Sequence, residues 1–187
     1  MRESRSEGLS KIRLLILDVD GVLTDGRLPY EGRGNEIKAF HVQDGAAIRR
    51  WQAVGGLVAI ISGRQSPAVV CRAKDLGIAH VEQGVADKSP VYERICTLTG
   101  AGDEAVAVVG DDLMDLEPMR RCGYPIAVAN ALAQVKRAAR YVTRRRGGDG
   151  AVGEAIERLM RHNGIWPEVV RRFGSRLETE SHAAVDE

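Results

Sequence analysis

The sequence predicts an α/β protein with an open, mainly parallel Rossmann-like sheet and helices on both faces. Short apolar runs alternate along the chain with stretches of helical periodicity. The runs have few polar interruptions, as is typical of strands that are buried on both faces. The 187 residues suit one domain, and a composition of 44% hydrophobic and 28% charged residues is that of an ordinary globular protein.

The expected strands are the apolar runs themselves. They are Ile12–Leu17, Leu57–Ile61, Ile78–Val81, Ala105–Val109, Pro125–Ala129 and Tyr141–Thr143. The expected helices lie between and after them, at Asp44–Val54, Ala68–Leu76, Pro90–Leu98, Leu113–Arg121, Leu132–Ala139 and Ala151–Arg161. Because crossovers between parallel strands are right-handed, these helices should cover both faces of the sheet.

The longest departure from this alternation lies between the first strand and the first helix. Residues 26–42 contain two short extended pieces around a turn at Gly32–Gly34, which predicts a β-hairpin flap. The pattern as a whole predicts a polar N-terminal arm at residues 1–10, a folded domain at residues 11–162 and a C-terminal tail at residues 163–187.

The C-terminal tail carries apolar residues at helical offsets. They are Trp166, Val169, Val170, Phe173 and Leu177. Two alternatives fit this pattern: a short helix packed on its own domain, or an arm that reaches a neighbouring subunit.

Composition and charge exclude several functional classes. The formal net charge of +1 gives no reason to expect nucleic acid or an anionic membrane as a partner. Aromatic residues make up 4%, too few for a groove that stacks single-stranded bases. No apolar run reaches the roughly 18 residues of a bilayer span, and the first ten residues are polar. A cytoplasmic protein is therefore expected.

Three cysteines occur, at Cys71, Cys96 and Cys122. Their odd number and the lack of a CxxC pair argue against a disulfide framework and against a zinc site. We expect all three to be small core residues.

Pairs of carboxylates follow two of the expected strands. Asp18 and Asp20 come after the first strand, and Asp111 and Asp112 after the fourth. Because the carboxyl ends of parallel strands meet at one edge of a sheet, the four should form one acidic cluster. Such a cluster is costly unless a cation balances it, and Mg²⁺ is typically held by carboxylates, water and substrate phosphate. Capping of the following helices is the alternative, but it explains one Asp per strand rather than two.

Phosphate-binding groups follow the second and third expected strands. Ser62, Gly63 and Arg64 offer a small hydroxyl and backbone amides, which suit phosphate oxygens. Lys88 follows the third strand, just before a proline that suits the first turn of a helix. Each signal is weak alone, since Ser-Gly also begins ordinary turns. Together with the carboxylates they form a specific combination, in which Lys88 supplies a cation.

The order of these residues at successive strand ends resembles the haloacid dehalogenase superfamily of phosphohydrolases, over about residues 11–160. The resemblance implies that Asp18 is the nucleophile that becomes an aspartyl-phosphate. It implies that Asp20 is the general acid for the leaving group and then the base for water. Ser62 and Lys88 would hold the transferring phosphoryl oxygens.

The resemblance also implies a Mg²⁺ cofactor. Its ligands would be the Asp18 carboxylate, the Asp20 backbone carbonyl and Asp111, with Asp112 as a supporting acid. Ser62 lies 44 residues after Asp18 and 26 before Lys88, and neither gap has room for the cap domain of larger members. The resemblance is therefore to the uncapped form, in which a neighbouring subunit would cover the open site.

Further motifs resemble one uncapped group of acid-sugar phosphatases. They are DVDGVLTDG, the flap end FHVQDG, ISGR, GDDLMD and a late GGDGAV. This group implies hydrolysis of 3-deoxy-D-manno-octulosonate 8-phosphate in lipopolysaccharide synthesis, by a homotetramer whose hairpins form a central barrel. The implied substrate-binding residues are Ser62, Gly63, Arg64, Lys88 and Asp44, with Arg64 and Asp44 near the entrance.

One position departs from the pattern of this group. Gly153 stands where Arg is usual, which bears on the identity of the substrate. The run Arg144–Arg146 could substitute for that Arg, or it could be a solvated basic surface.

Two other functions compete with this reading. One is a phosphatase for a nine-carbon, sialic-acid-type sugar 9-phosphate, which a few pocket residues would distinguish. The other is a non-catalytic regulatory or oligomerising module of the same fold. The intact set of Asp18, Asp20, Ser62, Lys88 and Asp111 argues against a non-catalytic module.

Overall fold

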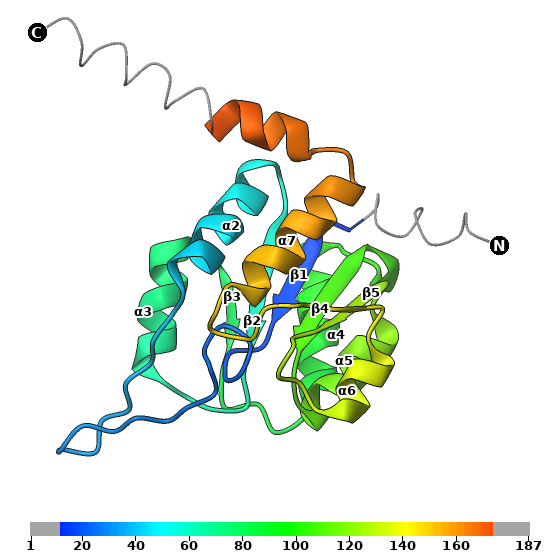
Figure 1. Ribbon diagram of the computed structural model, residues 1–187. Helices are drawn as coiled ribbons and strands as arrows, with labels where there is room; N and C mark the ends of the chain where they lie inside the picture. The colour runs from blue at the N-terminus through cyan, green and yellow to red at the C-terminus, as the bar shows by residue number, and fades with distance from the viewer. Residues whose placement is uncertain (1–11, 174–187) are drawn as a thin grey trace, which may run out of the picture.

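The computed structural model describes residues 12–173. Its central feature is a six-stranded sheet of order β3-β2-β1-β4-β5-β6 (Figure 1). Every neighbouring pair of strands is parallel, which confirms the predicted open α/β sheet. The strands are β1 (Leu14–Leu17), β2 (Leu57–Ile61), β3 (His80–Glu82), β4 (Val106–Gly110), β5 (Tyr124–Ala127) and β6 (Tyr141–Val142).

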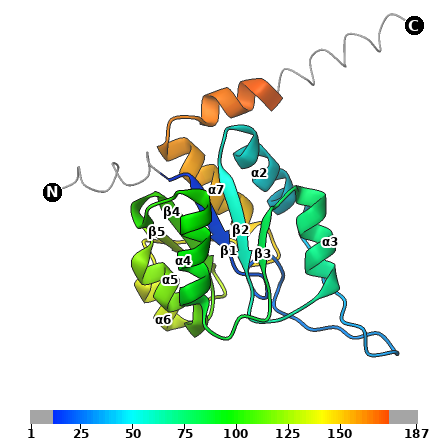
Figure 2. The ribbon, with the colours of Figure 1, turned by 180° about the vertical axis from the view of Figure 1, so that it is seen from behind.

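Helices cover both faces of the sheet, as predicted. They are α2 (Val42–Ala53), α3 (Pro67–Leu76), α4 (Lys88–Thr99), α5 (Leu116–Arg121), α6 (Ala133–Ala138) and α7 (Ala151–His162), with short 3₁₀ turns η2 (Asp103–Ala105) and η3 (Leu113–Asp115). Helices α2 and α7 lie on one face, and α4, α5 and α6 lie on the other (Figures 1 and 2).

Hydrogen bonds to Asp side chains explain two of the helix starts that differ from the prediction. Helix α4 begins at Lys88 rather than at Pro90, because the Asp87 carboxylate accepts the Ser89 N–H and caps the helix. The helix expected from Leu113 begins as η3, in a capping box between Asp112 and Asp115, and becomes α-helical only at Leu116.

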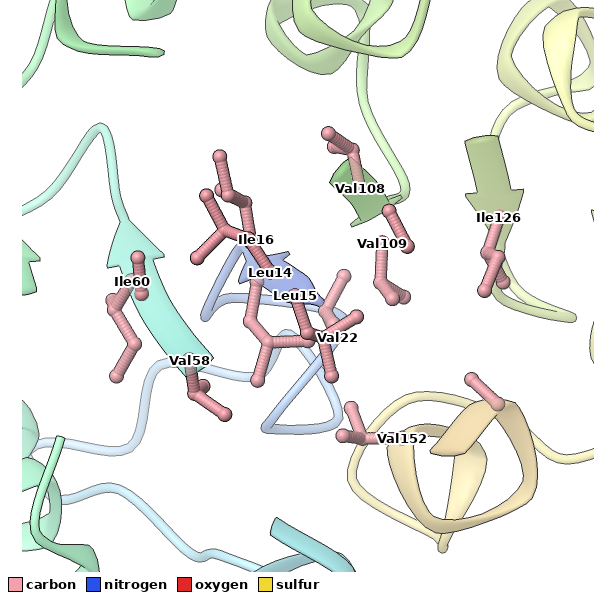
Figure 3. Packing of buried hydrophobic residues seen from close by; sticks show 14 of the residues in the cluster. Leu14, Leu15, Ile16, Val22, Val58, Ile60, Val108, Val109, Ile126 and Val152 are labelled. Carbon is pink, nitrogen blue, oxygen red and sulfur yellow. The ribbon is translucent and has the colours of Figure 1, made fainter. Parts of the chain in front are cut away.

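The core is built around β1, whose four residues are all buried. Leu15 pairs in register with Val58 of β2 and with Ala107 of β4, so β1 lies between the two longest strands. In Figure 3, Val152 of α7 approaches the sheet on the side of Leu15, and Figures 1 and 2 show α4 on the opposite face. Cover on both faces explains why β1, β2 and β4 are apolar throughout.

The predicted flap is present, but it has little regular β-structure. A single antiparallel bridge joins Tyr30 to Glu36, and the Gly34 N–H donates to the Glu31 carbonyl at 2.9 Å to form the expected turn. Gly34 has a φ of +82°, which glycine adopts without strain. The segment projects away from the sheet (Figure 1), and Tyr30 is 58% exposed, so packing within this chain does not stabilise longer strands there.

The beginning of the predicted C-terminal tail packs on its own domain. A helix spans residues 166–173, Val169 is buried in the core, and the Arg172 guanidinium donates to the Ala53 carbonyl. The other alternative, an arm to a neighbour, rests on Val170, which is exposed, and on Leu177, which lies outside the described residues. The predicted N-terminal arm at residues 1–10 also lies outside them.

The prediction that all three cysteines are core residues was wrong for one of them. Cys122 is buried and Cys96 is half-buried, but Cys71 is exposed. In α3 the buried residues are Val69, Ala73 and Leu76, and Cys71 falls on the opposite face of that helix. No helix within residues 12–173 has the length and apolarity that a bilayer crossing requires.

Candidate active site

Three predicted site residues follow neighbouring strands at one edge of the sheet. Asp18 follows β1, Ser62 follows β2 and Asp111 follows β4, with β1 between the other two strands. The three strands are parallel, so their carboxyl ends bring these residues to the edge where open α/β sheets bind ligands. Lys88 is the first residue of α4, the element that follows β3 in the chain, and its side chain reaches the same place.

Lys88 is the cation of the cluster, as the sequence predicted. Its ammonium donates to Asp18 Oδ1 and to Asp115 Oδ1, both at 2.7 Å. The side chains of all three residues are less than one-tenth exposed. An ammonium buried to this degree is tolerated because it has two carboxylate partners.

Asp115 is a member of the cluster that the sequence analysis missed. The supporting acid was expected at Asp112, but the Asp112 side chain is exposed and accepts the Leu113 N–H at 2.7 Å. Asp115 is buried, and its Oδ2 accepts the N–H of Asp111 at 2.9 Å and of Asp112 at 3.2 Å. The third Asp in GDDLMD, three residues after the helix cap, is the pattern of a capping box and could have indicated this.

Three carboxylates converge in the cluster, each able to offer one oxygen to a metal ion. Ligand oxygens of Asp18, Asp111 and Asp115 all lie within 4.8 Å of one another. Asp111 Oδ1 is buried and has no hydrogen-bond partner among the described residues. An unpartnered buried carboxylate oxygen beside two further carboxylates suits a hard divalent cation.

The electrostatics of the cluster favour an added positive charge. Burial, opposed by Lys88, raises the pKa of Asp18 to about 6. Burial and the neighbouring Asp18 and Asp115 carboxylates raise the pKa of Asp111 to about 8. Three carboxylates facing one ammonium carry excess negative charge when all are ionised, so a divalent cation would relieve both the repulsion and the desolvation. The residues present therefore fit a metal site.

Gly21 allows the loop after β1 to pass close to the cluster. Its φ is +94°, and a Cβ at this position would lie 2.0 Å from Asp111 Oδ2. The Gly21 carbonyl accepts from the Asn130 amide at 2.8 Å, and Asn130 Oδ1 accepts the Gly147 N–H at 2.6 Å. The late glycine motif is thereby attached to the loop that carries Asp18 and Asp20.

Ser62 and Gly63 occupy the turn after β2. Ser62 is buried, its N–H donates to the Glu82 carbonyl at 2.9 Å, and its hydroxyl oxygen accepts the Arg64 N–H at 3.3 Å. Gly63 is exposed, and a Cβ there would lie 3.3 Å from Met114 of η3. The turns after β2 and β4 therefore lie close together.

The Asp20 carboxylate is separate from the acidic cluster and contacts the flap instead. Lys38 donates to Asp20 Oδ1 and lies 2.8 Å from Glu36 Oε1. Arg64 pairs with Glu36 at 2.5 Å, and its Nε lies 3.9 Å from Asp20 Oδ2. Lys38 and Glu36 are residues that the sequence analysis did not single out, because neither stands at a strand end.

Asp44, which the family resemblance implies as a substrate-binding residue, has a hydrogen-bond partner within the fold. Asp44 is 1% exposed in the first turn of α2, where its Oδ1 accepts the Gly153 N–H at 2.7 Å. Burial raises the pKa of its carboxyl group. Asp44 thus joins α2 to α7, and a Cβ at Gly153 would lie 3.3 Å from Asp44 Oδ1, a tight contact.

The arginines near Gly153 line a separate hollow between α2, α7 and the segment after β6. We call it the arginine hollow; it has a volume of about 720 Å³ and is lined by Arg50, Arg144, Arg145, Arg158 and Arg161 together with Gly153, Glu154 and Glu157. Two residues of the Arg144–Arg146 run therefore do line the same hollow as Gly153. None of the strand-end carboxylates lines it.

Comparison with known proteins agrees with this geometry. Residues 78–156 match the haloacid dehalogenase-like hydrolase family. The 3-deoxy-D-manno-octulosonate 8-phosphate phosphatase KdsC of Yersinia pestis is 42% identical over 151 residues, which cover 81% of each chain. KdsC of Escherichia coli K12 is 44% identical over 149 residues, which cover 80% of this chain and 79% of that relative.

The chain belongs to the KdsC family of haloacid dehalogenase-like hydrolases.

Solved structures of the KdsC family extend this similarity to the fold. The phosphatase of Moraxella catarrhalis, in complex with a magnesium ion, a phosphate ion and a KDO molecule, has a TM-score of 0.88 at 36% identity. The match covers 92% of this chain and 99% of that one. The Haemophilus influenzae protein, solved in a cobalt-bound form, has a TM-score of 0.82 at 38% identity and covers 85% of this chain and 93% of its own.

Proposed function

We propose that this chain is a Mg²⁺-dependent phosphatase that hydrolyses 3-deoxy-D-manno-octulosonate 8-phosphate to the free sugar acid and phosphate. The observation that carries the proposal is the buried cluster in which Lys88 holds Asp18 beside two further carboxylates. The names of the relatives, at 42–44% identity over most of the chain, support the substrate.

In the first step, we assign Asp18 as the nucleophile. Lys88 holds Asp18 Oδ1 and so fixes the orientation of the carboxylate. The carboxylate attacks phosphorus, a bond forms between Asp18 and the phosphoryl group, and the bond from phosphorus to the sugar oxygen breaks. Asp20, protonated at this stage, donates its proton to the departing alkoxide.

In the second step, the aspartyl-phosphate is hydrolysed. Asp20, now ionised, accepts a proton from a water molecule, whose oxygen attacks phosphorus. The bond to Asp18 breaks, which releases phosphate and restores the free carboxylate. The Ser62 hydroxyl, the Gly63 backbone and the Lys88 ammonium would stabilise charge on the phosphoryl oxygens, with Arg64 at the entrance.

The carboxylates of Asp18, Asp111 and Asp115 would hold Mg²⁺, together with the Asp20 carbonyl that the family resemblance implies. Bound there, the ion supplies positive charge that offsets both the carboxylates and the phosphoryl oxygens. Asp115 also keeps Lys88 in place and, through the N–H groups that it accepts, fixes the turn that carries Asp111.

We propose further that the protein works as a homotetramer in the cytoplasm. A flap with Tyr30, Ile37 and Val42 exposed offers apolar surface to neighbouring subunits, and a neighbour could cover the site that the missing cap leaves open. A charged sugar phosphate does not cross a bilayer unaided, so the enzyme must share the compartment of its substrate. A mass close to one chain in solution would contradict this assembly.

Phosphate release from a panel of sugar phosphates tests the proposed function. The panel includes the eight-carbon and nine-carbon acid-sugar phosphates with Mg²⁺, and Asp18→Asn serves as the blank. We expect a strong preference for the eight-carbon substrate. Preference for the nine-carbon substrate would keep the reaction and change the substrate, and no release from any compound would favour a non-catalytic module.

A further inference from the structure

Four charged side chains connect the flap to the loop that carries Asp20. Lys38 lies between Asp20 and Glu36, and Arg64 lies between the same two acids on the other side. The set therefore closes on itself and joins three segments: the loop after β1, the flap, and the turn after β2. We call it the flap network.

Lys38 is the most deeply placed member of the flap network. Its side chain is 1% exposed, although the flap around it projects into solution. Burying an ammonium group is costly, and the position is tolerated because the Asp20 carboxylate accepts its hydrogen bond and the Glu36 carboxylate forms an ion pair with it. These contacts keep the pKa of Lys38 above its ordinary value despite burial. A charge held in this way fixes the positions of its partners.

The two oxygens of Asp20 are in different situations. Oδ1 accepts from Lys38, whereas Oδ2 is buried and has no hydrogen-bond partner among the described residues. The Arg64 Nε atom, at 3.9 Å, is too far from Oδ2 for a hydrogen bond. The hydrogen bond to Oδ1 fixes the orientation of the carboxylate and therefore the direction of Oδ2. The unpartnered Oδ2 is the atom available to exchange a proton with a leaving group or with water.

We propose that Lys38 is a positioning residue for Asp20, by which the flap aims Asp20 Oδ2 at the leaving-group oxygen. Glu36 holds Lys38, and Arg64 holds Glu36, so the flap contributes to the proton-transfer step. This inference rests on the proposed function, because it requires Asp20 to act as general acid and base.

The choice of leaving group separates positioning of an acid from general damage to the site. A sugar alkoxide leaves well only if it is protonated, whereas 4-nitrophenolate leaves without a proton. Misplacement of a catalytic group by about 1 Å costs roughly 100-fold. The ratio kcat/KM reports formation of the aspartyl-phosphate and not its hydrolysis, in which Asp20 serves both esters alike. For Lys38→Met we therefore expect about a 100-fold loss of kcat/KM with 3-deoxy-D-manno-octulosonate 8-phosphate, and a loss below about 3-fold with 4-nitrophenyl phosphate.

Three further variants complete the experiment. Lys38→Arg keeps a donor and should recover part of the sugar-phosphate activity. Arg33→Met, in the exposed tip of the flap, is the matched control and should change neither rate. In a background of Asp20→Asn, which removes the acid, Lys38→Met should cost no further activity, because Lys38 acts through Asp20.

An equal loss of kcat/KM with both phosphate esters in Lys38→Met would overturn the inference, since it would show that Lys38 does not act on protonation of the leaving group. No loss with either ester, or an additive loss on top of Asp20→Asn, would overturn it as well. These outcomes leave the proposed function intact. If instead the wild-type protein hydrolysed neither ester, the proposed function itself would fail, and the inference with it.

Discussion

The strand-end cluster and the arginine hollow are both rich in charge, but they hold that charge in different ways. In the cluster, Lys88 and its partners Asp18 and Asp115 are buried, and each contact is made at 2.7 Å. In the hollow, the Arg161 and Glu157 side chains pair at 2.7 Å while both remain about half exposed. Similar distances therefore occur in a desolvated site and in a solvated one.

The two regions differ in the burial of their charges rather than in the number of charges. A buried charge lacks water, so it depends on specific partners and shifts the pKa of its neighbours, as at Asp111. Exposed ion pairs contribute between zero and about 1 kcal/mol. Five arginines line the arginine hollow. The exposed charges among them are screened by solvent and do not depend on specific partners.

The largest expected effect is at Asp18. Asp18→Asn keeps the size and burial of the side chain and removes the nucleophilic carboxylate. We expect a loss of turnover of about 10⁴-fold or more, measured as phosphate release with Mg²⁺. An unchanged far-UV circular dichroism spectrum would show that the fold is retained, and substantial remaining turnover would exclude Asp18 as nucleophile.

The next effect is on stability, at Lys88. Lys88→Met removes the ammonium from between two buried carboxylates, so we expect the free energy of unfolding to fall by about 3–5 kcal/mol. Denaturant unfolding of the Mg²⁺-free protein at pH 7 measures it. A loss below about 1 kcal/mol would mean that the cluster is as well solvated as the hollow.

The pH dependence of the Mg²⁺-free protein sharpens the comparison further. The pKa of Asp111 is raised to about 8, and that of Asp18 to about 6, both above their ordinary value of 3.8. The folded state therefore holds protons that the unfolded state has lost. This contribution to stability is complete below about pH 4 and is lost as the pH rises towards 8.

We therefore expect the free energy of unfolding to fall between pH 5 and pH 8 without Mg²⁺, and to fall less in Asp111→Asn. Because Mg²⁺ competes with these protons, its binding at pH 7 should release about one proton, as titration calorimetry in buffers of different ionisation enthalpy would detect. Binding without proton release would contradict the raised pKa of Asp111.

The smallest effect is expected in the arginine hollow. Glu157→Gln removes the exposed ion pair with Arg161, leaves the Arg161 guanidinium over the Trp166 ring, and is the control for Lys88→Met. We expect a loss of less than about 1 kcal/mol in the free energy of unfolding, and an unchanged kcat. A loss comparable to that of Lys88→Met would remove the distinction between the two regions.

The sequence sufficed to predict the parts of the site that stand at strand ends. Apolar runs locate the strands, and parallel strands bring Asp18, Ser62 and Asp111 to one edge. The sequence could not distinguish Asp112 from Asp115, because that choice depends on how the 3₁₀ turn rotates each side chain. The sequence did not indicate Lys38 for a related reason. Its contact with Asp20 depends on the course of the flap, which has little regular structure.

Asp44 shows a second kind of contact that the sequence does not indicate. The family resemblance implied a substrate contact for Asp44, and the structure shows that its Oδ1 also accepts the Gly153 N–H across the packed helices α2 and α7. A single sequence does not show which helix faces meet, so a buried polar link between two helices looks like a site residue.

The central claim, that the buried carboxylate of Asp18 forms a covalent intermediate, is tested most directly by acid-quench mass spectrometry. The wild-type protein is mixed with 3-deoxy-D-manno-octulosonate 8-phosphate and Mg²⁺, quenched during turnover and digested. We expect a phosphorylated peptide that contains Asp18 and that is absent from Asp18→Asn. Rapid phosphate release with no phosphorylated peptide at any quench time would contradict the account, since it would indicate direct attack by water.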